Sequence, residues 1–88
     1  RVTPEYLESI FLHSQWQFHI FDSSQLTVCC LTLPNGFTVT GESACVSPEN
    51  FDQEIGEKVA RDNAIRKIWA LEGYLLKEQI HNNVARLS

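Results

Sequence analysis

The sequence is poor in the features that mark several large classes of protein. No apolar run approaches the ~20 residues that a membrane-spanning helix needs, and the first residues lack the pattern of a secretory signal peptide. Four scattered glycines do not form a glycine-rich phosphate-binding loop. Basic residues are also few, seven against eleven acidic ones, and the net charge of −4 repels free nucleic acid on average. We therefore expect no membrane contact, and nucleic acid is a disfavoured partner.

Cysteine occurs three times, an odd number that does not suggest a disulfide framework. Cys29 and Cys30 would point to opposite faces of a strand, and neighbours cannot bridge each other without strain. None of the histidines, His13, His19 and His81, forms the close-spaced pair with a thiol that a zinc site requires. We expect a reduced, cytoplasmic protein with no metal and no cofactor.

The sequence also lacks a convincing set of catalytic residues. A cysteine nucleophile needs a histidine base; His19 would lie on the strand next to Cys29, on a face that the sequence does not assign. Ser43 beside Glu42 is a weaker candidate. Four acids could hold a divalent cation, but their place near a helix start favours the helix dipole instead: Glu49, Asp52, Glu54 and Glu57. We predict no catalytic residue and no enzymatic activity.

What the sequence does contain is a globular pattern, with 43% apolar and 20% charged residues in a single domain of 88. Two triplets, Thr3-Pro4-Glu5 and Ser47-Pro48-Glu49, combine a capping hydroxyl, a first-turn proline and an acid. They predict one helix over residues 4–13 and another that starts at Pro48. Alternation predicts strands over residues 16–21, 26–33 and 37–45, with a turn at residues 22–25.

The pair Asn35-Gly36 predicts a two-residue type I′ hairpin. That turn places Thr32 opposite Val39 and Cys30 opposite Gly41. One face of the sheet, the predicted core side, then carries Leu26, Val28, Cys30, Phe37, Val39 and Cys45. The other face carries the threonines of the hairpin, Cys29, and Leu31 and Leu33, which we expect to be partly exposed.

The last helix is predicted to be long and amphipathic. Its apolar positions are Phe51, Ile55, Val59, Ala64, Ile68, Leu71 and Leu75. Its outer face offers i,i+4 ion pairs between Glu54 and Lys58, Glu57 and Arg61, and Asp62 and Arg66. Unbroken to residue 80 it would span about 50 Å, against roughly 25–30 Å for a compact chain of this size. It must either break, most easily at Gly73, or project and be covered by another body.

The element order predicts an α+β fold, an α-β-β-β-α two-layer sandwich with a three-stranded antiparallel meander. Double-stranded-RNA-binding domains have the same order, but they place lysines at the start of the last helix. This chain has Glu49, Asp52 and Glu54 there. Contact with a protein is the preferred hypothesis, through the edge strand and the late helix. The residues predicted to bind a partner are Leu31, Leu33, Thr38, Thr40, Glu42, Trp69 and Tyr74.

The hairpin "LTLPNGFTVTGESACVSPENFD" and the later runs "ARDNA" and "IWALEGYLL" are similar to the gene 49/gene 66 family of small proteins of tailed phages and prophages. The resemblance covers roughly residues 26–80. It implies an accessory protein and carries no catalytic residue with it. By analogy with small phage proteins, we expect it to act in the cytoplasm of the infected host, on a host or phage protein or as a homodimer, in host takeover or counter-defence.

Overall fold

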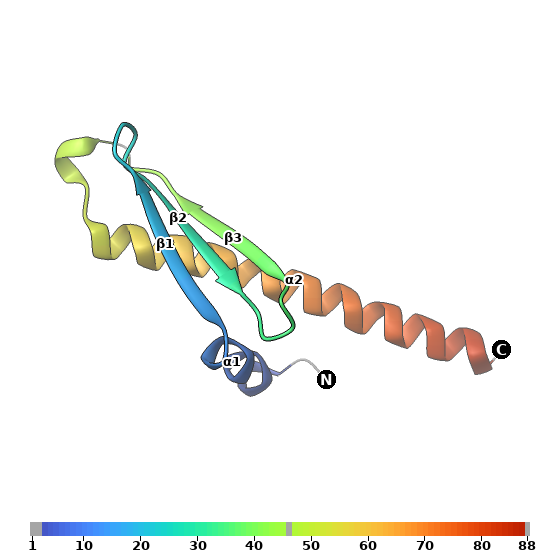
Figure 1. The fold of residues 1–88 in the computed structure, drawn as a ribbon. Helices are drawn as coiled ribbons and strands as arrows, with labels where there is room; N and C mark the ends of the chain where they lie inside the picture. Colours follow the sequence, from blue (N-terminus) through green and yellow to red (C-terminus); the bar gives the residue numbers. More distant parts are fainter. Residues whose placement is uncertain (1–2, 46, 88) are drawn as a thin grey trace.

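The computed structural model describes residues 3–45 and 47–87. Helix α1 (Pro4–Leu12) is followed by strands β1 (Gln15–Phe21), β2 (Leu26–Thr32) and β3 (Thr38–Ser43). A one-turn 3-10 helix η1 (Pro48–Asn50) then precedes the long helix α2 (Gln53–Leu87). The predicted α+β class and α-β-β-β-α order are confirmed (Figure 1).

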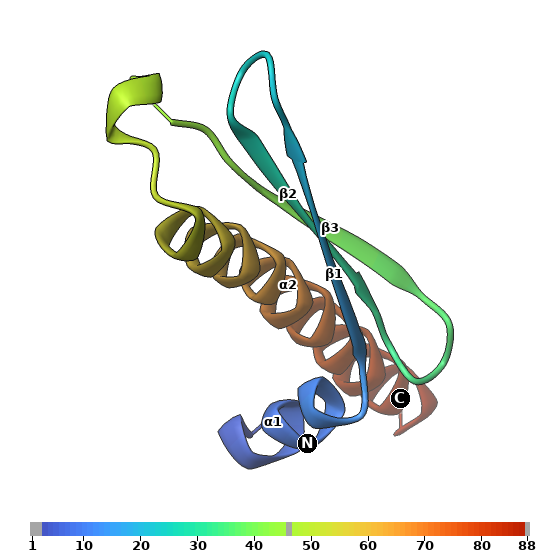
Figure 2. The ribbon, with the colours of Figure 1, turned by 60° about the vertical axis from the view of Figure 1, so that its left-hand side comes forward.

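The three strands form an antiparallel sheet in the order β1-β2-β3. Helix α2 runs along one face of this sheet, and no described element covers the opposite face (Figure 2). Two side chains of α2 hold the two outer strands. Arg61 stacks over the Trp16 ring of β1, 4.8 Å from its centroid, and Asn63 Nδ2 donates to the Glu42 carbonyl of β3 at 2.7 Å. The helix is therefore fixed across the full width of the sheet.

The core lies between the sheet and α2. One cluster joins Leu7 of α1 to Leu31, Val39 and Ile68, and a second consists of Cys29, Ala60 and Ala64. Ala60 and Ala64 let the backbone of α2 come close to the sheet, because their side chains are only methyl groups. Two predicted stripe positions, Ala64 and Ile68, are confirmed as buried, whereas Ile55, Val59, Leu71 and Leu75 are exposed.

The predicted hairpin register is wrong by one residue. Gly36 N donates to the Leu33 carbonyl and Leu33 N donates to the Phe37 carbonyl, both at 2.8 Å, so the loop holds three residues. Gly36 has a φ of +90°, and Asn35 is not in the left-handed region. This is a turn closed by a glycine bulge, not the two-residue type I′ turn. Leu31 therefore pairs with Val39 and Cys30 with Thr40.

A slip of one residue turns every side chain of a strand to the other face. Thr27, Cys29 and Leu31 consequently point to the core, while Leu26, Val28 and Cys30 do not. Val39 was placed correctly. The expectation that Leu31 lies partly exposed is wrong, because its exposed fraction is 0%. Leu33 is half-buried and packs against the first core cluster.

The first helix start is confirmed and the second is shifted. The Thr3 hydroxyl accepts from Tyr6 N at 3.1 Å. Ser47-Pro48-Glu49 opens only η1, and α2 begins at Gln53. Its cap is Asp52, whose Oδ1 accepts from Glu54 N at 3.0 Å and from Ile55 N at 3.3 Å. Two capping sequences follow each other here, and the second, at Asp52, begins the α-helix.

Helix α2 does not break at Gly73; it continues for 35 residues, about 50 Å, and the molecule is 60 Å long. None of the three expected i,i+4 ion pairs forms in the part of the chain described. Lys58 instead pairs with Asp62 at 3.0 Å, Arg66 donates to Asn63, and Arg61 lies over Trp16. No described helix combines the length and apolarity needed to cross a membrane.

Candidate interaction surfaces

The uncovered face of the sheet carries three of the predicted partner-binding residues. Thr38, Thr40 and Glu42 alternate along β3 away from α2. Next to Thr40 and Glu42 in the register lie Cys30 and Val28, both half-buried. This face is mixed in polarity, with apolar groups on the central strand and polar groups on the edge.

Strand β3 is an edge of the sheet, as the sequence suggested. Its free side is nevertheless approached by α2, because the Glu42 carbonyl already accepts from Asn63. A backbone group that is already bonded offers less to an incoming strand. Addition of a partner's strand to β3 is therefore hindered near its end at Ser43.

A more apolar surface lies where the hairpin tip meets α2. Phe37, Val39 and Leu71 line a groove there, and Lys67 is the single charged residue among those that line it. Phe37 was predicted to face the core, but its side chain is 52% exposed. Thr38 and Ala70 complete the lining.

Tyr74 adjoins this groove, because it follows Lys67, Ala70 and Leu71 at steps of seven, four and three on the same side of α2. Trp69 does not share that side. Five residues separate the two aromatics, which rotates them about 140° apart around the helix. The two predicted anchors therefore belong to two different surfaces.

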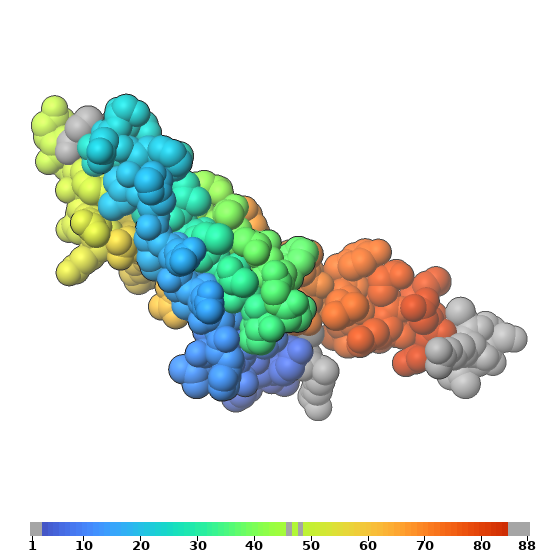
Figure 3. Space-filling model, in the orientation of Figure 1, coloured from blue at the N-terminus to red at the C-terminus, as the bar shows by residue number. Residues whose placement is uncertain are grey.

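From Trp69 to Val84 no side chain of α2 is buried. Beyond the hairpin tip, which Ala70 and Leu71 still adjoin, the later turns of α2 project past the sheet (Figure 3). The segment from Trp69 to Val84 nevertheless carries large apolar side chains: Trp69, Leu71, Tyr74, Leu75, Ile80 and Val84. Exposed apolar groups at this density are typical of surfaces that bind another protein.

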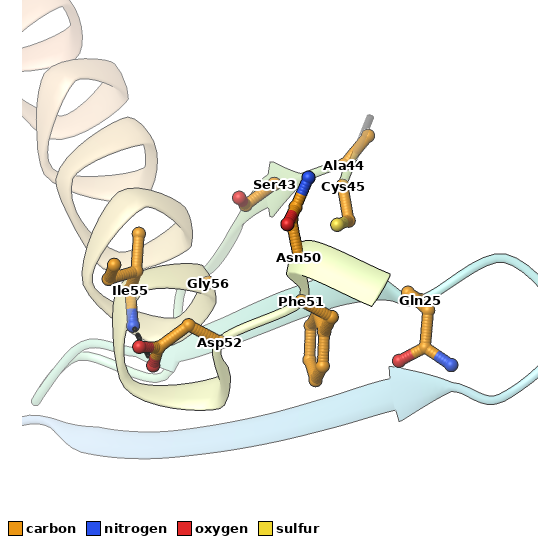
Figure 4. Close-up of a pocket in the computed structure, with 9 residues that line it drawn as sticks. All are labelled: Gln25, Ser43, Ala44, Cys45, Asn50, Phe51, Asp52, Ile55 and Gly56. Atoms are coloured by element: carbon orange, nitrogen blue, oxygen red, sulfur yellow. Dashed lines mark hydrogen bonds between the residues drawn. The ribbon is translucent and has the colours of Figure 1, made fainter. Parts of the chain in front are cut away.

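A small hollow lies between the end of β3, η1 and the start of α2 (Figure 4). Its volume is about 110 Å³, room for only a few waters at roughly 30 Å³ each. Its two ionisable lining groups are both engaged. The Cys45 thiol donates to the Ser47 carbonyl at 2.7 Å, and the Asp52 carboxylate caps α2. The hollow thus consists of groups that fix the helix start.

The thiols and histidines are not brought together as a nucleophile would need. Cys29 faces the core and His19 lies on the opposite face, paired with Val28. Burial raises the pKa of the Cys29 thiol to about 11; the neighbouring Cys30 adds to the shift and the Arg61 guanidinium opposes it. At neutral pH this thiol stays protonated. Among the described residues, no group of three His, Cys, Asp or Glu side chains is placed to hold a metal ion.

The sequence did not reveal the groove. About thirty residues of sequence separate Phe37 from Lys67 and Leu71. The predicted hairpin register also assigned Phe37 to the wrong face. The available signal was local: an aromatic residue directly after a turn, with a lysine and a leucine four residues apart on the late helix. Only the packing of the hairpin against α2 brings them together.

Comparison with known proteins adds one match. The model of a family described as phage protein (N4 Gp49/phage Sf6 gene 66) matches residues 2–80, so the similarity extends over both helices and all three strands. A search of curated proteins and a search of solved structures each found no match.

Proposed function

The chain belongs to the phage protein (N4 Gp49/phage Sf6 gene 66) family, and from this membership we propose that it is a non-catalytic accessory protein of a phage. In this proposal it acts in the cytoplasm of the host cell by binding another protein, and it serves host takeover or counter-defence. The binding site is the groove between the hairpin tip and α2.

The observation that carries this proposal is the exposure of apolar groups that line one shallow, open groove. Phe37 and Leu71 are 52% and 45% exposed and line the same groove. Tyr74 lies one turn further along α2, on the side of the helix that carries Lys67, Ala70 and Leu71. An exposed aromatic side chain beside other apolar groups is typical of the centre of a protein interface.

The residues that line the groove support one kind of partner in this proposal. The lining is apolar apart from Thr38 and Lys67, so the partner presents an apolar side chain. The Lys67 ammonium favours an acidic group beside that side chain, because opposite charges across an interface steer and align the encounter. We expect an acidic segment with one or two large apolar residues.

Affinity capture from infected cells tests the proposal. The wild type is compared with Phe37→Asp, with Leu71→Asp and with a matched control, Phe21→Asp, which alters a similarly exposed aromatic (46%) away from the groove. Circular dichroism confirms that each variant is folded. A protein retained by the wild type and by Phe21→Asp, but lost from Phe37→Asp and Leu71→Asp, supports the groove. A captured protein that is retained equally by all four chains contradicts it.

Nucleic acid binding is the second candidate function, because the α-β-β-β-α order matches that of double-stranded-RNA-binding domains. The net charge of −4 and the acids Asp52 and Glu54 at the start of α2 oppose it. A gel shift with double-stranded RNA at low salt distinguishes the two. Binding that weakens steeply with added salt would replace the protein partner with nucleic acid.

A further inference from the structure

Gly73 has no role within the chain that the structure describes. A Cβ added to Gly41 or Gly56 would press on neighbouring atoms, so the fold requires glycine at both positions. A Cβ added to Gly73 meets nothing within 4 Å. Glycine in the middle of a helix is less favourable than alanine by about 1 kcal/mol. Packing within the described chain therefore does not require glycine at this position.

Gly73 sits within an apolar stripe on the side of α2 that faces away from the sheet. Trp69, Gly73, Leu76 and Ile80 follow one another at steps of four, three and four, so they share a sector of about 60°. That sector lies about 150° around the helix from the face that carries Ala60, Ala64 and Ile68. Trp69 is 42% exposed, Ile80 is 50% exposed and Leu76 is half-buried.

The 4-3-4 spacing is that of the contact positions in a coiled coil, conventionally called a and d. With Trp69 and Leu76 at d, Gly73 and Ile80 occupy a. In parallel coiled coils, isoleucine at a with leucine at d favours two helices over three or four. One turn or more earlier, the same side of α2 carries Asp62 and Arg66, so the apolar contact begins where the sheet ends.

We propose that this stripe binds the same stripe of a second copy of the chain, in a parallel two-helix contact over the projecting half of α2. Gly73 leaves room for the two Trp69 indoles one turn earlier, since small and large residues alternate in well-packed interfaces. The sheet lies on the other side of α2 and does not obstruct the approach.

Charge supports the second copy and the parallel direction. Glu72 and Lys77 flank the stripe on opposite sides, five residues apart. In a parallel pair, Glu72 of each helix faces Lys77 of the other, which gives two ion pairs. In an antiparallel pair, Glu72 would face Gln79 and Lys77 would face Ala70, and neither contact pairs opposite charges. The molecule is therefore complementary to itself in one direction only.

Charge exchange tests the proposal. Light scattering and sedimentation over a concentration series should show a dimer for the wild type. Lys77→Glu alone or Glu72→Lys alone should weaken dimerisation about tenfold, because two attractions become two repulsions. The double variant Glu72→Lys/Lys77→Glu should restore it. Lys67→Glu, which makes the same charge change on the groove side of α2, should leave dimerisation unchanged. A monomer at millimolar concentration overturns the proposal, as does a double variant no better than the single ones.

Cysteine cross-linking tests the direction. In a background with Cys30 and Cys45 replaced by serine, Ile80→Cys should oxidise to a covalent dimer in full chains, because like positions face each other in a parallel pair. Leu75→Cys, about as exposed but on the sheet side, should not. Cross-linking of Leu75→Cys but not Ile80→Cys contradicts the stripe. Phe37→Asp should still form the dimer, so a failure of the groove and a failure of the stripe are separate results.

Discussion

Gly41 of β3 and Ala60 of α2 are in direct backbone contact. A Cβ built on Gly41 would overlap the carbonyl oxygen of Ala60 and lie 3.0 Å from the Ala64 Cα. Both obstacles belong to the helix backbone, which cannot rotate away as a side chain can. This contact sets the separation of sheet and helix, and every buried residue between them depends on it.

Gly41→Ala should therefore destabilise the protein by about 2–3 kcal/mol, the upper range for overpacking a core. Denaturant unfolding measures the effect. Gly73→Ala is the control, since it should stabilise the helix by about 1 kcal/mol at concentrations where the chain is monomeric. Equal effects of the two substitutions would contradict the backbone contact at Gly41.

Thr27→Val should stabilise the protein by about 1 kcal/mol. Thr27 Oγ1 is fully buried and has no hydrogen-bond partner among the described residues, and an unpaired buried hydroxyl is unfavourable. Valine has the same shape without that oxygen. Thermal and denaturant unfolding check the result, with Thr40→Val on the open sheet face as the control. A clear loss of stability in Thr27→Val would mean that the hydroxyl is hydrogen-bonded in solution.

Stability should fall as the pH rises from 9 towards 11. The Cys29 thiol has a pKa of about 11 in the folded chain against 9.0 for the ordinary group. Over this interval the unfolded chain loses the proton and the folded chain keeps it, so alkali favours unfolding, by on the order of 2 kcal/mol. Urea unfolding at pH 8, 9, 10 and 11 measures the slope. Cys29→Ala should lower stability at every pH but flatten the fall in stability with rising pH. If the slope is unchanged in this variant, a group other than the Cys29 thiol causes it.

Asp52→Ala should destabilise the start of α2 by about 1 kcal/mol, because its carboxylate accepts from two backbone N–H groups of the first turn. Asp52→Asn keeps a capping oxygen, so it should lose only a small part of the stability that the cap contributes. Ser47→Ala should have a smaller effect than Asp52→Ala, since Ser47 precedes only the 3-10 turn. The opposite order would restore Ser47 as the cap of the long helix.

Local sequence patterns predicted many of the elements of this fold. The Thr3-Pro4-Glu5 triplet marks the true start of α1, and two-residue alternation marks the strands within one or two residues. These predictions succeed because capping and strand periodicity depend on neighbours in the sequence. The pattern also predicted a long last helix, but the sequence left open whether that helix continues through Gly73.

The hairpin and the surfaces built on it needed the tertiary structure. Asn35-Gly36 suits a two-residue turn and Pro34-Asn35-Gly36 suits a three-residue turn, and local chemistry does not choose between them. Both faces of β2 carry apolar residues, so polarity does not decide between the two registers. The choice is made by fit: Gly41 must meet the backbone at Ala60 and Ala64, and only one register turns Cys29 and Leu31 toward them.

The sequence by itself determined the element order, the presence of a long last helix and the family, because these depend on local pattern. Tertiary packing alone decided which strand face is buried, that Leu31 belongs to the core, and that Phe37 meets Lys67 and Leu71 at a groove. The physical reason is that a strand has only two faces and one residue of register exchanges them. The choice is therefore set by contacts between residues that are far apart in the chain.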